Sequence, residues 1–374
     1  MKVLEVELRC AELPLVAPLR AAHGSTSVRR VVLVLARTEA GDGWGECAAL
    51  AEPTYTSEHA AGALAVMRDH LVPRLLALDE LELDGTGEAL AGVRGHRMAK
   101  AALEMAILDA GLRAEGRSLA THLGAVHEVV PAGASLGLTD DPAALVEEAS
   151  GLLASGYRRL KVKVRPGWDH VPLAALRAIG SDVTLVADGN GAYGRGDLDC
   201  LVALDELGLA ALEQPLAPDD LIGHAELARR AATPIALDES ISSAAGAETA
   251  LALGACTAVS VKAGRVGGLR EAVAVVERCQ AAAARAWCGG MLETGLGRAA
   301  ALVVAALPGI TEAGDLGPSD RYLAPDLTEP FVLTDGDLPP DPAAAEVAVE
   351  VVTGEPGDGS AAVDVAAGDR AVAV

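Results

Sequence analysis

Five ionisable residues recur at almost constant spacing through the middle of the sequence. Each ends a short apolar run, and the steps between them are 25, 25, 25 and 24 residues; the five are Lys163, Asp188, Glu213, Asp238 and Lys262. Three neighbouring carboxylates would repel one another unless a cation lay between them, and carboxylate oxygens in rigid positions suit a hard divalent ion. We therefore expect the three acids to bind Mg²⁺ or Mn²⁺.

The two lysines of this set could move a proton to and from a substrate. A free lysine, with a pKa of about 10.4, is a poor base at neutral pH, but burial and nearby positive charge lower that pKa. Lys161 lies on the same face of a strand as Lys163, and Arg265 follows Lys262 by three residues, so both could supply such charge. A metal-bound carboxylate would have an acidified α-proton, and its loss would give an enediolate stabilised by the ion. The pattern predicts proton abstraction α to the carboxylate of a small-molecule substrate.

The constant spacing arises from a repeat of strands and helices. From about residue 130, eight short apolar runs, the first "VVPAGASLGL" and the last "ITEAGDLG", alternate with amphipathic segments such as "DPAALVEEASGLLASGY". This alternation predicts parallel pairing, and eight units predict an α/β fold, a (β/α)8 TIM barrel whose last helix is modified, that is, a (β/α)7β-like barrel. In such barrels the active site lies at the carboxyl ends of the strands, where the five residues fall.

The segments before and after the barrel are organised differently. Residues 1–125 read as antiparallel strands followed by helices near 57–77 and 97–114, which predicts a separate α+β capping domain. We expect the catalytic barrel to span 126–320. The C-terminal segment 321–374 is expected to return to the first domain as a strand, and its end is a candidate for disorder.

The composition excludes several classes of partner. The chain of 374 residues has a formal net charge of −23, so neither a nucleic acid nor an anionic membrane surface is an expected partner. No uncharged apolar run approaches the roughly 20 residues that cross a bilayer. The six cysteines form no CxxC pair and are expected to be reduced thiols, which favours a cytoplasmic protein.

The motifs around the five residues resemble those of the enolase superfamily, in its muconate-lactonizing subgroup. In chain order they are "KVK", "DGN", "EQP", "DES" and "VKAGRVGG". The segments "GHRMAKAALEMAILDAGLRA", "WCGGMLETGLGRAA" and "SDRYLAPDLTEPFVL" narrow the resemblance to the o-succinylbenzoate synthase/N-acylamino acid racemase family, over about residues 10–335. Gly189 in "DGN", where Ala is commoner, and the tail after residue 337 depart from the family pattern. The mandelate-racemase branch is excluded because it places a histidine on a late strand, and no histidine here follows residue 224.

The resemblance also implies roles. It makes Lys163 and Lys262 the acid/base pair and the three acids the metal ligands. In this family the first domain caps the barrel, so the loop 18–26 and the segment 51–58 would close over the substrate and exclude water. Relatives tend to form oligomers, and a homo-oligomer is expected here too.

Further residues at strand ends are expected to line the pocket. They are Ser135, Lys161, Asn190 and Met291. Glu239, next to a predicted ligand, is expected to orient Lys262 rather than to bind the metal, and Arg265 is expected to support the same lysine.

Several activities would share these residues. The family implies o-succinylbenzoate synthase, a carbon–oxygen lyase that dehydrates a cyclohexadiene precursor in menaquinone biosynthesis, or an isomerase, N-acylamino acid (N-succinylamino acid) racemase, or both. Dipeptide epimerase and muconate cycloisomerase of the same subgroup remain alternatives. A Schiff-base aldolase on the same barrel would need one isolated lysine, which three adjacent acids disfavour. A non-catalytic barrel that only binds a ligand is the alternative from another class, and the complete set of charged strand ends argues against it.

Overall fold

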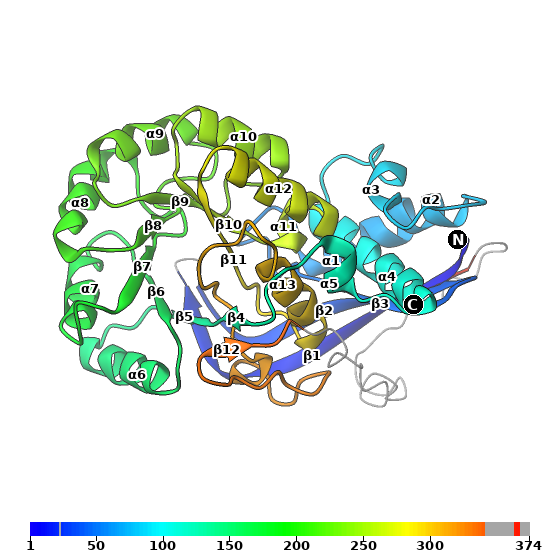
Figure 1. The fold of residues 1–374 in the computed structure, drawn as a ribbon, viewed down its shortest axis with the longest axis horizontal. Helices are drawn as coiled ribbons and strands as arrows, with labels where there is room; N and C mark the ends of the chain where they lie inside the picture. Colours follow the sequence, from blue (N-terminus) through cyan, green and yellow to red (C-terminus); the bar gives the residue numbers. More distant parts are fainter. Residues whose placement is uncertain (22–23, 341–362, 367–374) are drawn as a thin grey trace.

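An antiparallel sheet begins the chain, and a strand from the C-terminal segment is added to its edge (Figure 1). The computed structural model describes residues 1–21, 24–340 and 363–366. The sheet has the order β13-β1-β2-β3. Its strands are β1 Val3–Ala21, β2 Gly24–Thr38, β3 Gly41–Cys47 and β13 Val363–Ala366. The antiparallel strands predicted for the N-terminal part are thus confirmed, and β13 pairs with β1.

The central part of β2 is buried on both faces, which explains its uninterrupted apolar run "VVLVLA". Successive side chains of a strand point to opposite faces. Val32 and Val34 pack on one side with the helices of the N-terminal domain. Val31 and Leu33 pack on the other side with Leu296, a residue of the barrel. The capping domain is therefore fixed to the barrel through its own sheet.

Most helices of the N-terminal part pack on the face of the capping sheet that carries Val32 and Val34. The helices of this part are α1 Ala60–Val66, the π-helix η1 Met67–Leu71, α2 Val72–Leu76, α3 Thr86–Ala89, α4 Arg97–Glu115 and α5 Leu119–Leu123. The helices predicted near 57–77 and 97–114 are confirmed. The longest of them, α4, lies directly on β3: a Cβ at Gly45 would lie 2.0 Å from the carbonyl oxygen of Ala102, so only glycine permits this approach.

The middle of the chain forms seven parallel strands surrounded by helices (Figure 1). The strands are β5 Gly133–Leu136, β6 Arg159–Lys163, β7 Thr184–Asp188, β8 Ala211–Glu213, β9 Ile235–Leu237, β10 Ala258–Val261 and β11 Arg285–Cys288. The helices are α6 Pro142–Ala154, α7 His170–Arg177, α8 Leu198–Ala203, α9 Leu221–Arg230, α10 Ala244–Ala252, α11 Ala263–Val266, α12 Leu269–Ala281 and α13 Gly295–Ala305. Short 3-10 helices occur at η2 Arg195–Asp197, η3 Leu204–Leu207 and η4 Ser319–Arg321. The strands follow one another in sequence order across the sheet, which is typical of a TIM-type barrel.

The eighth predicted strand differs from a regular one. The segment "ITEAGDLG" makes two backbone hydrogen bonds to β11, from Thr311 N to the oxygen of Ala286 (3.1 Å) and from Asp315 N to the oxygen of Cys288 (3.2 Å). On its other side, Gly314 forms an isolated parallel bridge with Ala132, just before β5. The segment thus lies where an eighth strand would close the barrel, but it makes too few backbone hydrogen bonds to its neighbours to form a regular β-strand.

The strands β4 Val130–Pro131 and β12 Asp337–Leu338 form a separate antiparallel pair. Within the described ranges, no helix is both long and apolar enough to cross a membrane. The part of the C-terminal tail for which disorder was predicted, and residues 22–23 of the predicted closing loop, lie outside the described residues.

Candidate active site

The alternation of β6 explains why its sequence carries two lysines. Leu160 and Val162 point outward into the core between sheet and helices. Arg159, Lys161 and Lys163 therefore point into the barrel. Arg159 stacks on the Trp287 ring at the bottom of the barrel, with its guanidinium carbon 4.1 Å from the ring centroid. The two lysines lie above it, toward the carboxyl ends of the strands.

The five residues of the spacing pattern lie at one end of the barrel. Lys163, Asp188 and Glu213 are the last residues of β6, β7 and β8, and Asp238 and Lys262 directly follow β9 and β10. Four of them line a cavity of about 140 Å³; Glu213 is fully buried. The order of the sheet places the lysine-bearing strands on either side of the three acid-bearing strands.

The Lys161 ammonium lies among three carboxylates. Its Nζ is 2.9 Å from Glu213 Oε1, 3.4 Å from Asp188 Oδ2 and 2.6 Å from Asp315 Oδ2. Burial alone would lower the pKa of Lys161, but these three acids raise it well above its ordinary value. Asp315 was not among the predicted site residues, although it ends the eighth apolar run as the other acids end theirs, which is a signal visible in the sequence.

Lys163 has two acceptors at the cavity. Its Nζ lies 3.2 Å from Asp188 Oδ2 and also donates to Asn190 Oδ1. Burial of Asp188 is outweighed by Lys163 and Lys161, which hold the pKa of that carboxyl below its usual range. The amide of Asn190 in turn donates to Glu239 Oε1 at 3.1 Å. Glu239 was expected to orient Lys262, but its hydrogen bond goes to Asn190, and burial together with Asp188 raises the pKa of Glu239 to about 7.

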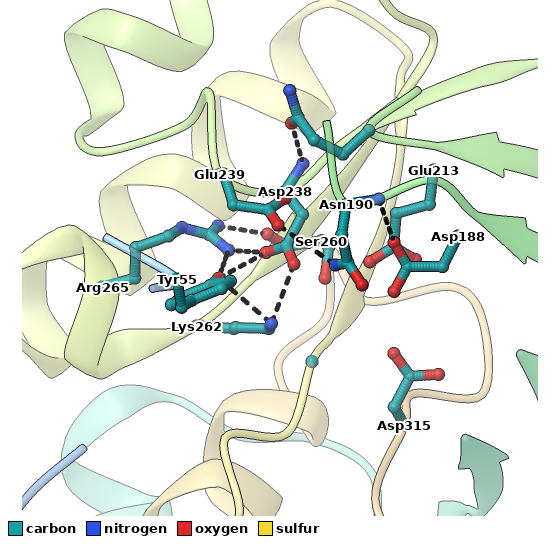
Figure 2. Close-up of polar contacts among 12 residues, drawn as sticks. Tyr55, Asp188, Asn190, Glu213, Asp238, Glu239, Ser260, Lys262, Arg265 and Asp315 are labelled. Carbon is teal, nitrogen blue, oxygen red and sulfur yellow. Dashed lines mark hydrogen bonds and ion pairs between the residues drawn. The ribbon is translucent and has the colours of Figure 1, made fainter. Parts of the chain in front are cut away.

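Lys262 is held by Asp238 and by a tyrosine from the capping domain. Its Nζ lies 2.9 Å from Asp238 Oδ2 and donates to the Tyr55 hydroxyl at 3.1 Å. That hydroxyl donates to Asp238 Oδ1 (2.9 Å) and accepts from Arg265 Nη1 (3.0 Å), and Arg265 also pairs with Asp238 (Figure 2). Burial alone would lower the pKa of Lys262, but Tyr55 and nearby carboxylates raise it. Arg265 thus lies beside Lys262 as expected, whereas the pKa of Lys262 is raised here rather than lowered.

The predicted metal ligands are brought together only in part. Asp188 and Glu213 lie side by side in the register of β7 and β8, while the Asp238 carboxylate is turned toward Tyr55, Lys262 and Arg265 (Figure 2). Among the described residues, no three His, Cys, Asp or Glu side chains are arranged to hold one ion. In type, however, the donors fit a hard divalent cation, because all three are buried carboxylates from adjacent strands. Within the described residues Glu213 Oε2 accepts no hydrogen bond, and its ion-pair partner Arg159 Nη2 lies 3.7 Å away.

The remaining wall of the cavity comes from both domains. The four expected substrate contacts all line it, namely Ser135, Lys161, Asn190 and Met291. The other lining side chains were not predicted individually; they are Leu50, Tyr55, Leu292, Arg298, Asp315 and Tyr322. Leu50 and Tyr55 belong to the capping domain, and the segment 51–58 was expected to cover the substrate without any one residue being singled out.

Two domain-family models match the chain. The "Mandelate racemase / muconate lactonizing enzyme, N-terminal domain" model matches residues 3–124, and the "Enolase C-terminal domain-like" model matches residues 144–355. A solved structure with the same fold is an enolase-superfamily member from Listeria innocua, with a TM-score of 0.90 at 34% identity over 94% of this chain and 96% of that one.

Curated relatives align over nearly the whole chain. An N-succinylamino acid racemase from Amycolatopsis sp. is 51% identical over 340 residues, covering 91% of this chain and 92% of the racemase. An o-succinylbenzoate synthase from Geobacillus stearothermophilus is 39% identical over 347 residues, covering 92% of each chain. Enzymes of this superfamily generally use a divalent metal. The matched domain models, these relatives and the fold show that the chain belongs to the enolase superfamily.

Proposed function

We propose that the protein removes a proton α to a carboxylate and then either returns it on the opposite face or couples its loss to dehydration. One observation carries the proposal: Lys163 and Lys262 line a single cavity from strands that flank the acid-bearing strands on both sides. A carboxylate substrate bound between them would offer its α-carbon to a nitrogen on each side. This arrangement suits a racemase and a lyase equally well.

Mg²⁺, or Mn²⁺ in its place, is the proposed cofactor, held by Asp188, Glu213 and Asp238. When bound, the ion would supply positive charge beside the substrate carboxylate and so acidify the α-proton. The Lys161 ammonium lies 2.9 Å from Glu213 Oε1 and 3.4 Å from Asp188 Oδ2 and adds positive charge beside the same two acids. Asp315, already paired with Lys161 at 2.6 Å, can keep that ammonium in place when the ion neutralises the other acids.

The relatives indicate two substrate classes. N-Succinylamino acids and other N-acyl amino acids are the proposed racemase substrates, and a cyclohexadiene carboxylate of menaquinone biosynthesis is the proposed substrate of the o-succinylbenzoate synthase reaction. In racemisation, one lysine removes the α-proton and the other donates a proton to the opposite face. In dehydration, Lys163 takes the α-proton and then gives it to the departing hydroxide, which leaves as water, while Lys262 stabilises the developing negative charge as an ammonium.

Ser135, Lys161, Asn190 and Met291 are proposed to contact the substrate, with Glu239 and Arg265 in support. The division into a capping domain (1–125), a catalytic barrel (126–320) and a returning segment (321–374) belongs to the same proposal. A cytoplasmic homo-oligomer that acts on small carboxylates is the proposed form of the enzyme.

A kinetic comparison of the two substrate classes tests the proposal. The purified full chain with Mg²⁺ should racemise N-succinylamino acids, form o-succinylbenzoate from its precursor, and exchange the α-proton with solvent in D₂O. Absence of turnover and of exchange, with Mg²⁺ bound, would favour the non-catalytic barrel. Preference for a dipeptide or for muconate would favour the epimerase or the cycloisomerase. Trapping of a substrate ketone on a lysine by borohydride would indicate the aldolase.

A further inference from the structure

The cavity wall contains a strained residue that needs support. Residues 289–294 connect β11 to α13, and Met291 and Leu292 of this connection line the cavity. Leu292 has a φ of 58°, in the left-handed region that side chains with a Cβ adopt at a cost in free energy. Such a conformation persists only where the surroundings impose it.

A buried arginine of the capping domain contacts this wall directly. Arg29, from β2, is 1% exposed. Its Nε donates to the carbonyl oxygen of Leu292 at 3.2 Å, and its Nη1 donates to the carbonyl oxygen of Ala49 at 2.6 Å. Ala49 precedes Leu50, which lines the same cavity. One guanidinium therefore joins the barrel wall of the cavity to the wall contributed by the capping domain.

A buried glutamate of the capping domain holds the next residues of the same connection. Glu46, from β3, is 3% exposed. Its carboxylate accepts from Thr294 N (3.2 Å), from Thr294 Oγ1 (2.6 Å) and from Gly297 N (3.0 Å). Thr294 is the N-cap residue of α13 and Gly297 lies in its first turn, so their backbone N–H groups have no acceptor within the helix, and a carboxylate is favoured there. Arg29 and Glu46 therefore hold the wall on both sides of Glu293, which itself pairs with Arg298 at 2.9 Å.

We propose that Arg29 and Glu46 are positioning residues that hold the Met291–Leu292 wall in its substrate-binding conformation and thereby set how tightly the substrate's side group is bound. Neither residue has a hydrogen bond or ion pair to Lys163 or Lys262 within the described structure, so the wall and the proton-transfer groups are held separately. For its kinetic part the inference rests on the function proposed above. Its structural part does not need a substrate.

The chain offers a matched control on the neighbouring helix. Glu104, from α4, is 4% exposed and accepts from the backbone N of Leu269 at the start of α12. It is thus a second buried capping-domain carboxylate at the N-terminus of a barrel helix. Among the described residues, none that belongs to α12 lines the cavity. Loss of Glu104 should weaken the contact between the domains without freeing the cavity wall.

The test compares Glu46→Gln with Glu104→Gln in the full chain. In the wild type both oxygens of Glu46 accept from Thr294 and Gly297, but in Glu46→Gln one oxygen is replaced by an NH₂ group that cannot accept. The backbone amides of Thr294 and Gly297 should therefore exchange with solvent about tenfold faster in this variant. In Glu104→Gln these two amides should exchange as in the wild type. For N-succinylamino acid racemisation, Glu46→Gln should raise KM about fivefold or more with kcat changed less than about twofold, and Glu104→Gln should change neither beyond about twofold.

Two results would overturn the inference: unchanged exchange at Thr294 and Gly297 in Glu46→Gln, or equal kinetic effects of the two variants. If Glu46→Gln does not fold, Arg29→Lys replaces it, because lysine keeps the charge but cannot bridge Leu292 and Ala49 at once. That variant should also raise KM selectively, and unchanged KM would contradict the inference. If the wild type turns over neither substrate class, the proposed function fails, but the exchange measurement still decides whether Glu46 holds the wall.

Discussion

Tyr55 of the capping domain covers Lys262 of the barrel, 207 residues later in the chain. The Tyr55 hydroxyl accepts from Lys262 Nζ at 3.1 Å, and the ammonium lies 4.7 Å from the centroid of the tyrosine ring. The same hydroxyl donates to Asp238 and accepts from Arg265. A residue outside the barrel therefore completes the surroundings of one of the two proposed acid–base groups.

Tyr55→Phe should slow every reaction that uses Lys262. The ring would remain, so the cation–π contact would persist, but Lys262 would lose one acceptor and Asp238 would lose one donor. We expect kcat for racemisation to fall by about 10- to 100-fold with a smaller change in KM. Tyr193→Phe is the matched control, because the Tyr193 hydroxyl bonds to Asp169 outside the cavity. Equal rates in both variants would show that the Tyr55 hydroxyl does not assist Lys262.

Substitution of the two lysines should separate the two proposed reactions. Lys163→Ala should abolish racemisation and dehydration, by more than about 10³-fold, and should also abolish α-proton exchange from the enantiomer whose proton faces Lys163, because the base on that side is removed. Lys262→Arg should abolish racemisation, since a guanidinium does not give up its proton, yet leave part of the dehydration, which needs only positive charge there. NMR in D₂O, started from each substrate enantiomer separately, measures the α-proton exchange that each variant retains. Persistent exchange from both enantiomers in Lys163→Ala would refute the assignment.

Removal of the divalent ion should abolish activity without unfolding the protein. Lys161 lies within 3.4 Å of both Asp188 and Glu213 and can neutralise them when no ion is bound. A chelator should therefore remove turnover completely, Mg²⁺ should restore it, and the Tm should change little. In Lys161→Met the acids would lose this ammonium, so the Tm of that variant should depend strongly on Mg²⁺. A Tm equally insensitive to Mg²⁺ in both proteins would contradict this account of the site.

The local pattern of the sequence predicted the parts of the site that each strand positions by itself. Lys163, Asp188 and Glu213 end their strands, and the repeat length that brings them into phase is visible without any knowledge of tertiary structure. Parallel strands of one barrel carry such residues to one end, so the spacing alone was enough. The regular helices of the capping domain were equally visible from their own residues.

The site residues that were not predicted are placed by contacts between segments far apart in the sequence. Tyr55 reaches the site from a loop of another domain, and nothing in its neighbouring residues marks its partner. Asp315 lies on a segment that closes the barrel without regular strand pairing, so its place in the repeat was less apparent. Glu46 contacts Thr294 across 248 residues and resembles any other charge at the end of a strand. Such long-range contacts become visible only when the domains are placed together.

The buried glutamates Glu46 and Glu104 should make the free energy of unfolding depend on pH. Burial raises the pKa of each carboxyl from 4.5 to about 7, even though Arg29 near Glu46 and the backbone N–H groups of Leu269 and Arg270 near Glu104 oppose the shift. The folded protein then binds more protons than the unfolded chain between pH 4.5 and about 7. Each glutamate therefore lowers stability progressively as the pH rises through this window, and its effect is constant above it.

The difference between wild type and Glu104→Gln isolates this effect, because other titrating groups cancel in the difference. A shift from 4.5 to about 7 corresponds to roughly 3 kcal/mol between the low and high ends of the window. Urea unfolding at pH 5 and at pH 8 should show Glu104→Gln gaining stability relative to the wild type by an amount of this order. Glu46→Gln should show the same trend, with Arg29 and Glu293 as the charged neighbours of Glu46. A difference between variant and wild type that stays constant from pH 5 to pH 8 would mean that these carboxyls are already ionised at pH 5 in the folded protein.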